Sequence, residues 1–267
     1  MNLELKGHTA LVTGGSKGIG ADIVRVLCEE GMRVAFCARE SAALRQLERE
    51  SQESGYTVMA LATDVRSAAG IAACVNTVLG AWGGLDLLVN NVGGAPGFGP
   101  LESLTDEQWQ EAFELNVMST VRFSRQCLPA LRKSTLRRII NLSSLSAVQP
   151  GRWNPHYTSS KAAMLNFSKF LANSLAPEGI LVNAVCPGPV HSDSWERNIV
   201  NSSQVQARSL DEVRNEIEQG EAAKVPLGRV GEGREIANAV AFLASPRSAW
   251  TTGSCFHIDG GKLAVSL

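Results

Sequence analysis

Short apolar runs alternate with amphipathic stretches along almost the whole chain. Seven runs have the length and composition of buried strands: Thr9–Thr13, Arg33–Cys37, Thr57–Ala62, Leu85–Val89, Arg138–Leu142, Leu181–Val185 and Cys255–Ile258. Helical spacing of apolar residues lies between them, notably over Ile19–Glu30, Ala42–Ser54, Ala68–Trp82, Asp106–Leu131, Pro155–Ala176 and Glu232–Ala244. Such alternation is typical of a parallel sheet covered by helices on both faces. It predicts a single doubly wound α/β domain over residues 1–267, with a seven-stranded parallel sheet flanked by helices.

One segment, His191–Val225, departs from this alternation. It is polar, with Trp195 near its start and a charged helical piece around Asp211–Glu221. It follows the carboxyl end of a strand, which is where open α/β sheets bind their ligands. We therefore interpret residues 191–225 as a lid over a substrate, with a structural excursion used for subunit contacts as the alternative.

Composition narrows the class of protein and of partner. With 44% hydrophobic and 19% charged residues, the chain has ample apolar material for a globular core. The net charge of −1 gives no reason to expect nucleic acid or a membrane as partner. A basic cluster, Arg132, Lys133, Arg137 and Arg138, is typical of a solvated loop near a helix end. The first residues enter a strand directly, without a signal sequence, which predicts a cytoplasmic protein.

The cysteine and histidine patterns predict no metal site. The six cysteines contain no C-x-x-C pair, and most of them lie in apolar runs, as buried free thiols do. The four histidines show no spacing typical of metal ligands.

A glycine-rich turn follows the first predicted strand. Gly14, Gly18 and Gly20 open the next helix in the spacing G-x-x-x-G-x-G. Glycines at such a turn let a pyrophosphate approach the backbone N–H groups at the positive end of the helix. The turn therefore indicates a dinucleotide, with a plain glycine turn as the alternative.

The end of the second predicted strand indicates which dinucleotide binds. NAD-binding folds commonly place an acidic residue there for the ribose 2′-hydroxyl, whereas a basic residue suits a 2′-phosphate. Ala38 occupies the place of the acid, Arg39 follows it, and Lys17 lies within the glycine turn. Because two cations can form charge-assisted hydrogen bonds with one phosphate, we expect NADP(H) in preference to NAD(H).

Tyr157 and Lys161 lie four residues apart on a predicted helix and therefore share one of its faces. An ammonium within about 4–6 Å lowers the pKa of a phenol by about 1–3 units, from an ordinary value of about 10. A phenol tuned in this way is useful for acid–base catalysis near neutral pH. Beside a dinucleotide, the pair predicts an enzyme of hydride transfer.

Together these features resemble the short-chain dehydrogenase/reductase family, over nearly the whole chain from Gly7 to about Lys262. The family pattern T-G-x-x-x-G-x-G is met by Thr13–Gly20, and the family motif N-N-A-G stands as Asn90-Asn91-Val92-Gly93. The resemblance implies a Rossmann-type fold and a catalytic set of Asn116, Ser144, Tyr157 and Lys161. It implies cofactor contacts from Gly14, Ser16, Lys17, Gly18, Ile19, Gly20, Arg39, Asp64, Val65, Asn91, Gly93, Tyr157, Lys161, Pro187, Gly188, Val190 and Ser192.

The resemblance also implies a role for each catalytic residue. Tyr157 would give a proton to the substrate oxygen, and Ser144 would add a hydrogen bond to it, with the neighbouring Ser143 as the alternative. Lys161 would keep the phenol acidic and hold the ribose, and Asn116 would hold a water that relays protons. Asp64 falls where family members bond the adenine.

The substrate is less well defined by the sequence. A mixed apolar and polar pocket is expected from Gly94, Ala95, Pro96, Leu145, Ser146, Gln149, Trp153, His191 and Trp195. We expect a small carbonyl compound or secondary alcohol, acted on as a free molecule.

Three alternatives to this function remain open. The first is a 3-oxoacyl-(acyl-carrier-protein) reductase, although Thr135 and Glu178 stand where some of these carry basic docking residues; Arg137 and Arg138 lie nearby. An NAD-linked alcohol or cyclic-diol dehydrogenase would need an acid near Ala38. A non-catalytic nucleotide-binding scaffold would often lack the tyrosine or the lysine.

Family members are usually tetramers, so the resemblance also implies a homotetramer. The two long helices, Asp106–Leu131 and Pro155–Ala176, would pack against their mates in other subunits, and Trp250–Leu267 would form a second interface.

Overall fold

The fold is that of a computed structural model, which describes residues 1–193, 195–196, 199–200 and 208–265. Its main sheet has seven parallel strands in the order β3-β2-β1-β4-β5-β6-β9. The strands are β1 (Thr9–Thr13), β2 (Arg33–Ala38), β3 (Val58–Ala62), β4 (Leu87–Asn90), β5 (Arg138–Leu142), β6 (Leu181–Pro187) and β9 (Cys255–Ile258). The predicted doubly wound α/β domain is confirmed.

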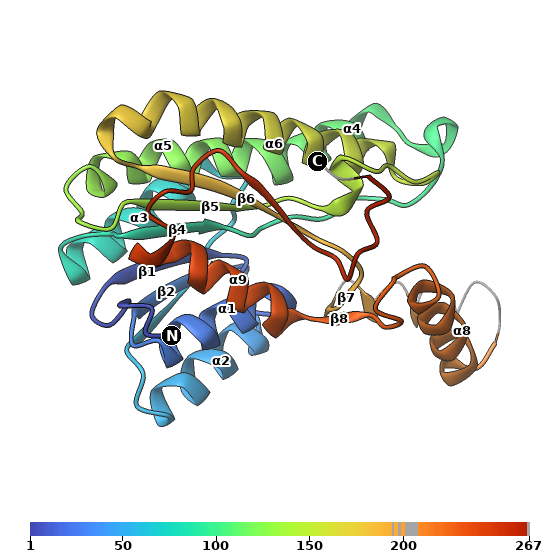
Figure 1. Cartoon of the computed structure of the whole chain (residues 1–267), viewed down its shortest axis with the longest axis horizontal. Coiled ribbons are helices and arrows are strands. Elements are labelled where there is room, and N and C mark those ends of the chain that lie inside the picture. The colour runs from blue at the N-terminus through green and yellow to red at the C-terminus, as the bar shows by residue number, and fades with distance from the viewer. Residues whose placement is uncertain (194, 197–198, 201–207, 266–267) are drawn as a thin grey trace.

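Helices cover both faces of the sheet (Figure 1). One layer contains α1 (Gly18–Glu29), α2 (Ala42–Glu53) and α9 (Gly233–Ala244). The opposite layer contains α3 (Ala68–Trp82), α5 (Ser119–Leu131) and α6 (Pro155–Leu175). Short 3-10 turns lie at Leu101–Ser103, Leu145–Ala147, Ala176–Glu178 and Pro246–Ser248.

The strands are mostly apolar because successive side chains point to opposite faces and both faces are buried. In β1, Val12 packs in the core under α1 and α9, whereas Leu11 packs in the core under α3 and α5. This explains why the strands appear in the sequence as short, mainly apolar runs, with buried polar exceptions such as Asn141 in β5 and Asn183 in β6.

The strand order reverses between β1 and β4, which are paired neighbours. The loops that leave the carboxyl ends of these two strands separate to opposite faces and open a crevice, where such sheets bind ligands. The glycine turn follows β1, and the motif Asn90–Gly93 begins on the last residue of β4, so both lie at this crevice.

The predicted helix Asp106–Leu131 forms, but not as a regular α-helix throughout. It consists of α4 (Asp106–Phe113), a π-turn at Glu114–Met118, and α5, which follow one another without a break. A capping box opens it, since Thr105 and Gln108 each bond the other's backbone N–H.

The segment at residues 191–225 is described only in part, because residues 194, 197–198 and 201–207 lie outside the described residues. Its described part includes β7 (Val190–His191), paired with β8 (Gly231–Glu232), and α8 (Leu210–Ala222). In Figure 1, α8 stands apart from the two layers that cover the sheet. Among the described helices, none combines the length and the hydropathy that crossing a bilayer requires.

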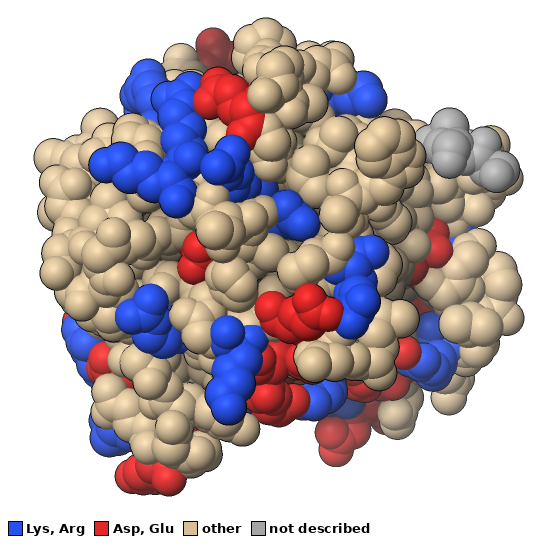
Figure 2. Space-filling view, turned by 60° about the vertical axis from the view of Figure 1, so that its left-hand side comes forward, with Lys and Arg blue, Asp and Glu red and all other residues tan. Residues whose placement is uncertain are grey.

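Acidic and basic side chains lie next to one another on the face shown in Figure 2. The basic cluster at residues 132–138 follows this pattern, since Arg132 Nε lies 2.5 Å from Glu178 Oε2. The prediction that this whole cluster is solvated is wrong for Arg138, which is 6% exposed. Its guanidinium donates to the carbonyl oxygens of Leu136 and Ser245, and burial lowers its pKa.

Candidate active site

The glycine turn after β1 is held tightly against the neighbouring strands. The N–H groups of Gly14 and Gly15 both donate to the Cys37 carbonyl oxygen, at 2.7 and 3.2 Å. Gly14 and Gly18 have φ angles of 67° and 51°, which glycine adopts without strain. No described side chain caps the N-terminus of α1, so its first N–H groups are available to an anion.

Asn91 fastens this turn to the end of β4. Its side-chain amide donates to the carbonyl oxygens of Thr13 and Gly14, at 3.0 and 3.1 Å, and its own N–H bonds the Thr13 hydroxyl. A Cβ at Gly20 would lie 2.5 Å from Nδ2 of Asn91, so the close approach requires glycine. The fold thus provides a cradle with room and N–H donors for a pyrophosphate, and the residues fit a dinucleotide.

The two cations expected at the adenosine end have different surroundings. Lys17 Nζ lies 3.2 Å from a carboxylate oxygen of Asp193, and both side chains are partly exposed. Arg39 is exposed, and its charge contributes to lowering the pKa of Asp64. The Lys17–Asp193 pair could not be predicted from the sequence, since it joins segments far apart in the chain.

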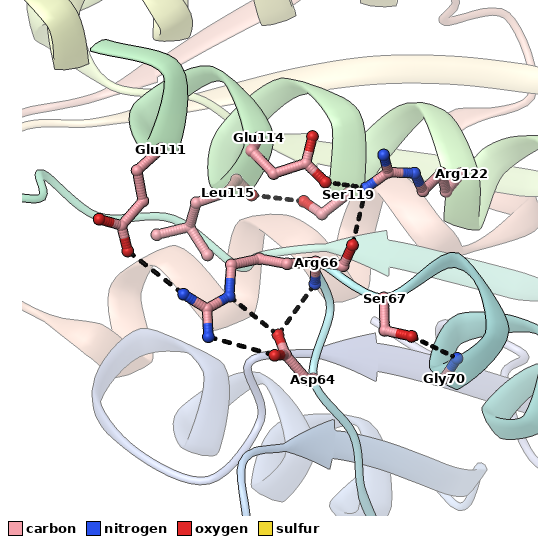
Figure 3. Close-up of polar contacts among 9 residues, drawn as sticks. All are labelled: Asp64, Arg66, Ser67, Gly70, Glu111, Glu114, Leu115, Ser119 and Arg122. Atoms are coloured by element: carbon pink, nitrogen blue, oxygen red, sulfur yellow. Dashed lines mark hydrogen bonds and ion pairs between the residues drawn. The ribbon is translucent and has the colours of Figure 1, made fainter. Parts of the chain in front are cut away.

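Asp64, expected beside the adenine, is engaged by Arg66 (Figure 3). The Arg66 side chain bonds both carboxylate oxygens of Asp64 at 3.1 Å, and the Arg66 backbone N–H donates at 3.0 Å. These bonds lower the pKa of Asp64, and Arg66 also reaches Glu111 on α4 at 3.3 Å. The neighbouring Val65 is 7% exposed and belongs to the core.

Asn116 lies in the π-turn and is fully buried. Its side chain forms a pair of 2.9 Å bonds with the backbone of Gly94 and donates to the Ser160 hydroxyl, also at 2.9 Å. Ser160 in turn donates to the Tyr157 carbonyl oxygen. A π-turn widens the helix by one residue, and such turns are frequent at functional sites.

Lys161 is 3% exposed, and its ammonium donates to the Leu142 carbonyl oxygen at 2.8 Å. Burial lowers its pKa to about 8. A Cβ at Gly93 would lie 2.6 Å from Lys161 Nζ and 3.0 Å from Asn116 Oδ1. Gly93 is therefore the point where the loop after β4 touches both side chains.

Tyr157 and Lys161 do share one face of α6, and Lys161 Nζ lies 5.9 Å from the centre of the Tyr157 ring. The prediction that Lys161 lowers the pKa of the Tyr157 phenol is wrong for the protein without a bound dinucleotide. Burial raises the pKa of Tyr157, and the opposing effect comes from a hydrogen bond with Ser144. The physical reason is that the ammonium is directed at the Leu142 carbonyl, while the hydroxyl is removed from water.

The two neighbouring serines after β5 have different environments. Ser143 is buried, and its hydroxyl donates to the Lys161 carbonyl oxygen at 2.9 Å. Ser144 is half-buried, and its hydroxyl lies 2.9 Å from that of Ser146 and within bonding reach of Tyr157. Of the two, Ser144 presents its hydroxyl to the crevice beside the phenol.

The stretch Pro187–Ser192 leaves β6 and returns to the glycine turn. The Gly188 N–H donates to the Ile258 carbonyl oxygen at 3.0 Å, and Val190 pairs with β8. A Cβ at Gly18 would lie 3.4 Å from Cβ of Ser192, which brings the two stretches together at one crevice.

His191 lies between two carboxylates. Its Nδ1 lies 2.8 Å from Glu232 and its Nε2 lies 3.3 Å from Glu218. It lines a cavity of about 1050 Å³ between α8 and α9. Trp153 stacks on Phe98 with 5.7 Å between ring centres, and both rings are exposed.

The chain is similar along its length to reductases. The family profile described as Enoyl-(Acyl carrier protein) reductase matches residues 14–262. The 3-oxoacyl-(acyl-carrier-protein) reductase FabG of Vibrio cholerae serotype O1 is 34% identical over 265 residues, which are 99% of this chain and 100% of that protein.

Solved structures agree with these sequence matches. The L-sorbose reductase from Gluconobacter frateurii, complexed with NADPH and L-sorbose, has a TM-score of 0.93 at 32% identity, covering 100% of both chains. A variant of the actinorhodin polyketide ketoreductase with NADPH has a TM-score of 0.90 at 35% identity, covering 97% of this chain and 98% of that chain.

Proposed function

The chain belongs to the short-chain dehydrogenase/reductase family, and on that premise we propose that it is an NADP(H)-dependent oxidoreductase of small carbonyl compounds and secondary alcohols. The observation that carries the proposal is the arrangement around Tyr157. Its hydroxyl meets Ser144, and Lys161 lies on the same helix face, opposite the loop after β4. These groups surround the crevice in which the glycine cradle lies.

A bound dinucleotide would supply or accept the hydride at its nicotinamide ring. In the direction of reduction, negative charge develops on the carbonyl oxygen, and Tyr157 donates its proton to that oxygen. A raised pKa keeps Tyr157 protonated over the physiological range, as a proton donor must be. Ser144 adds a second hydrogen bond to the same oxygen as charge develops.

Asn116 and Lys161 support Tyr157 in its role as proton donor. The buried ammonium of Lys161 would hold the ribose hydroxyls of a bound dinucleotide and would provide a positive charge near the reacting oxygen. Asn116, linked through Ser160 to the backbone of Tyr157, holds the water through which the phenol regains its proton. The remaining contacts with the dinucleotide come from the glycine turn, Asn91, Gly93 and the stretch Pro187–Ser192.

NADP(H) is preferred because no acid stands at Ala38, where one would bond a free ribose hydroxyl. Arg39 supplies one cation for a 2′-phosphate, and Lys17 supplies a second when it exchanges Asp193 for the phosphate. The reductases of similar structure that hold NADPH support this preference.

A free small-molecule substrate is favoured over a carrier-bound one. At the docking position of carrier reductases this chain has Glu178, which forms an ion pair with Arg132. Arg138 is buried and so does not offer its charge to an acidic carrier. The similar reductase that holds L-sorbose supports a small substrate, whereas the likeness to FabG keeps the carrier reductase as the second candidate. An NAD-linked dehydrogenase and a non-catalytic scaffold rank below both.

We propose that the segment at residues 191–225 acts as a substrate lid and that the protein works as a cytoplasmic homotetramer. The lid is supported by the contact between Asp193 and the glycine turn. The assembly is supported by apolar side chains on the outer surface, namely Phe170 of α6, which is 61% exposed, and the fully exposed Trp250.

The proposal is tested by following oxidation of NADPH and of NADH with a panel of ketones, sugars and one 3-oxoacyl thioester. Turnover of free ketones with NADPH is expected. Tyr157→Phe should keep NADPH binding and lose about 10²- to 10⁴-fold in kcat, the contribution of a general acid. Tyr56→Phe, at the only other tyrosine, is the matched control. An active Tyr157→Phe enzyme would refute the mechanism, and selective thioester turnover would favour the second candidate.

A further inference from the structure

Three side chains that can ligate a metal converge where β6 meets the edge strand β9. Cys186 Sγ lies 3.2 Å from Cys255 Sγ, and Cys255 Sγ lies 3.6 Å from His257 Nε2. The three ligand atoms all lie within 4.8 Å of one another. The parallel register places Cys186 opposite His257, so all three side chains point to the same face of the sheet.

We propose that Cys186, Cys255 and His257 form a binding site for one thiophilic divalent cation of the zinc type. Two thiolates and an imidazole are ligands that zinc prefers, and three protein ligands leave a fourth position for water. In the single chain Cys255 is exposed and His257 is half-buried, so both are open to solvent there, whereas Cys186 lies buried at the inner side of the site.

The backbone geometry favours an ion over a disulfide at these two cysteines. Cys255 pairs with Ala184, so Cys186 is displaced by two residues along the neighbouring strand. A spacing of ~4.8 Å between strands and ~6.6 Å along them places the two Cα atoms about 8 Å apart, beyond the ~4.4–6.8 Å of disulfides. The sulfur atoms can approach each other, but a bond between them would require movement of the strands.

The Cys186 and Cys255 thiols are hydrogen-bonded to each other, with 3.2 Å between their sulfur atoms. A thiol ligates a metal ion as the thiolate, so binding of the cation releases protons to solvent and affinity should rise with pH.

The site also lies beside the catalytic groups. Lys161 Nζ donates to the Leu142 carbonyl oxygen at 2.8 Å, and Leu142 pairs with Val185, the residue before Cys186. A cation bound at Cys186 places a positive charge near that ammonium, so we expect occupancy to lower turnover. This part of the inference rests on the proposed function, whereas the binding site itself does not.

The test is titration of the full-length, reduced protein with Co²⁺, which gives thiolate-to-cobalt absorption bands in the near ultraviolet. One Co²⁺ per chain is expected, displaced by Zn²⁺, with proton release that can be measured in weakly buffered solution. Cys255→Ser and His257→Asn should each weaken binding by about 100-fold or more, since loss of an outer-shell partner alone costs about 10- to 100-fold. Cys28→Ala and His8→Asn, which change a thiol and an imidazole elsewhere, should bind as the wild type does.

Absence of thiolate bands, or bands that persist unchanged in Cys255→Ser, would overturn the site. A Cys186–Cys255 disulfide in the isolated protein that excludes Co²⁺ would overturn it in favour of a redox pair. In the turnover assay, Zn²⁺ should inhibit the wild type and Cys28→Ala but not Cys255→Ser. Binding without inhibition would overturn the coupling to Lys161, and an inactive protein that binds Co²⁺ would contradict the proposed function alone.

Discussion

Replacement of Lys161 by methionine is expected to stabilise the protein while abolishing turnover. The fold leaves only 3% of this side chain exposed and lowers its pKa from 10.5 to about 8 through burial. The ammonium has one strong partner, the Leu142 carbonyl oxygen at 2.8 Å. Methionine fills a similar volume and carries no charge, so the substitution removes the cost of burying the ammonium.

The magnitude follows from the displacement of the pKa. At about 1.36 kcal/mol per unit, a fall from 10.5 to about 8 corresponds to about 3 kcal/mol of destabilisation of the folded state. Loss of the hydrogen bond to Leu142 destabilises the folded variant by about 1 kcal/mol, which offsets part of this gain. At pH 7 the Lys161→Met variant should therefore unfold with a free energy about 2 kcal/mol greater than that of the wild type.

The pH dependence of the unfolding free energy is an independent check on the sign of this stability change. Below pH 8 the folded and unfolded chains both hold the Lys161 proton, so the wild type carries the full cost of burial. Between pH 8 and 10.5 the folded chain releases the proton while the unfolded chain retains it, and wild-type stability rises. The difference in unfolding free energy between the Lys161→Met variant and the wild type should therefore shrink as pH rises through this range.

Urea unfolding of the cofactor-free protein at pH 7 and at pH 10 measures both effects. Lys169→Met is the matched control, because Lys169 is exposed on the same helix and should show no such pH-dependent difference. The reasoning is refuted if Lys161→Met is less stable than the wild type at pH 7. It is equally refuted if the difference between the two proteins is the same at both pH values.

Three further substitutions test other parts of the site and fold. Gly93→Ala places a Cβ 2.6 Å from Lys161 Nζ and should lower kcat about 100-fold, measured on protein whose circular dichroism is unchanged. Asn91→Ala removes two bonds to the glycine turn and should cost about 2 kcal/mol in urea unfolding and weaken NADPH binding in a fluorescence titration. Thr105→Ala removes one half of a capping box and should lower the free energy of unfolding in urea by about 1 kcal/mol. The kcat should be unchanged; a lower kcat would show that α4 transmits strain to Asn116.

Much of the fold could be predicted because its signals are local. Buried parallel strands are short, mainly apolar runs, the helices between them have apolar residues at helical spacing, and the glycine turn marks the opening of α1. Tyr157 and Lys161 could be placed on one face because their separation is one turn of a helix. Thr105 and Gln108 are close enough in sequence for the capping box to be recognised.

Other properties were decided only by tertiary structure. The π-turn at Glu114–Met118 accompanies bonds that tie Asn116 to Gly94 and Ser160, which come from other segments of the chain. The direction of the Tyr157 pKa depends on burial and on where the Lys161 ammonium points, and neither is encoded in their spacing.

The same holds for contacts that join distant parts of the chain. Lys17 meets Asp193 because the stretch after β6 folds back on the glycine turn. Cys186 meets Cys255 and His257 because β9 takes the place beside β6 at the edge of the sheet. The sequence by itself determined the elements, since backbone and side-chain preferences act over a few residues. The assembled fold determined charges, pKa values and clusters, since desolvation and Coulomb interactions depend on distances that only packing sets.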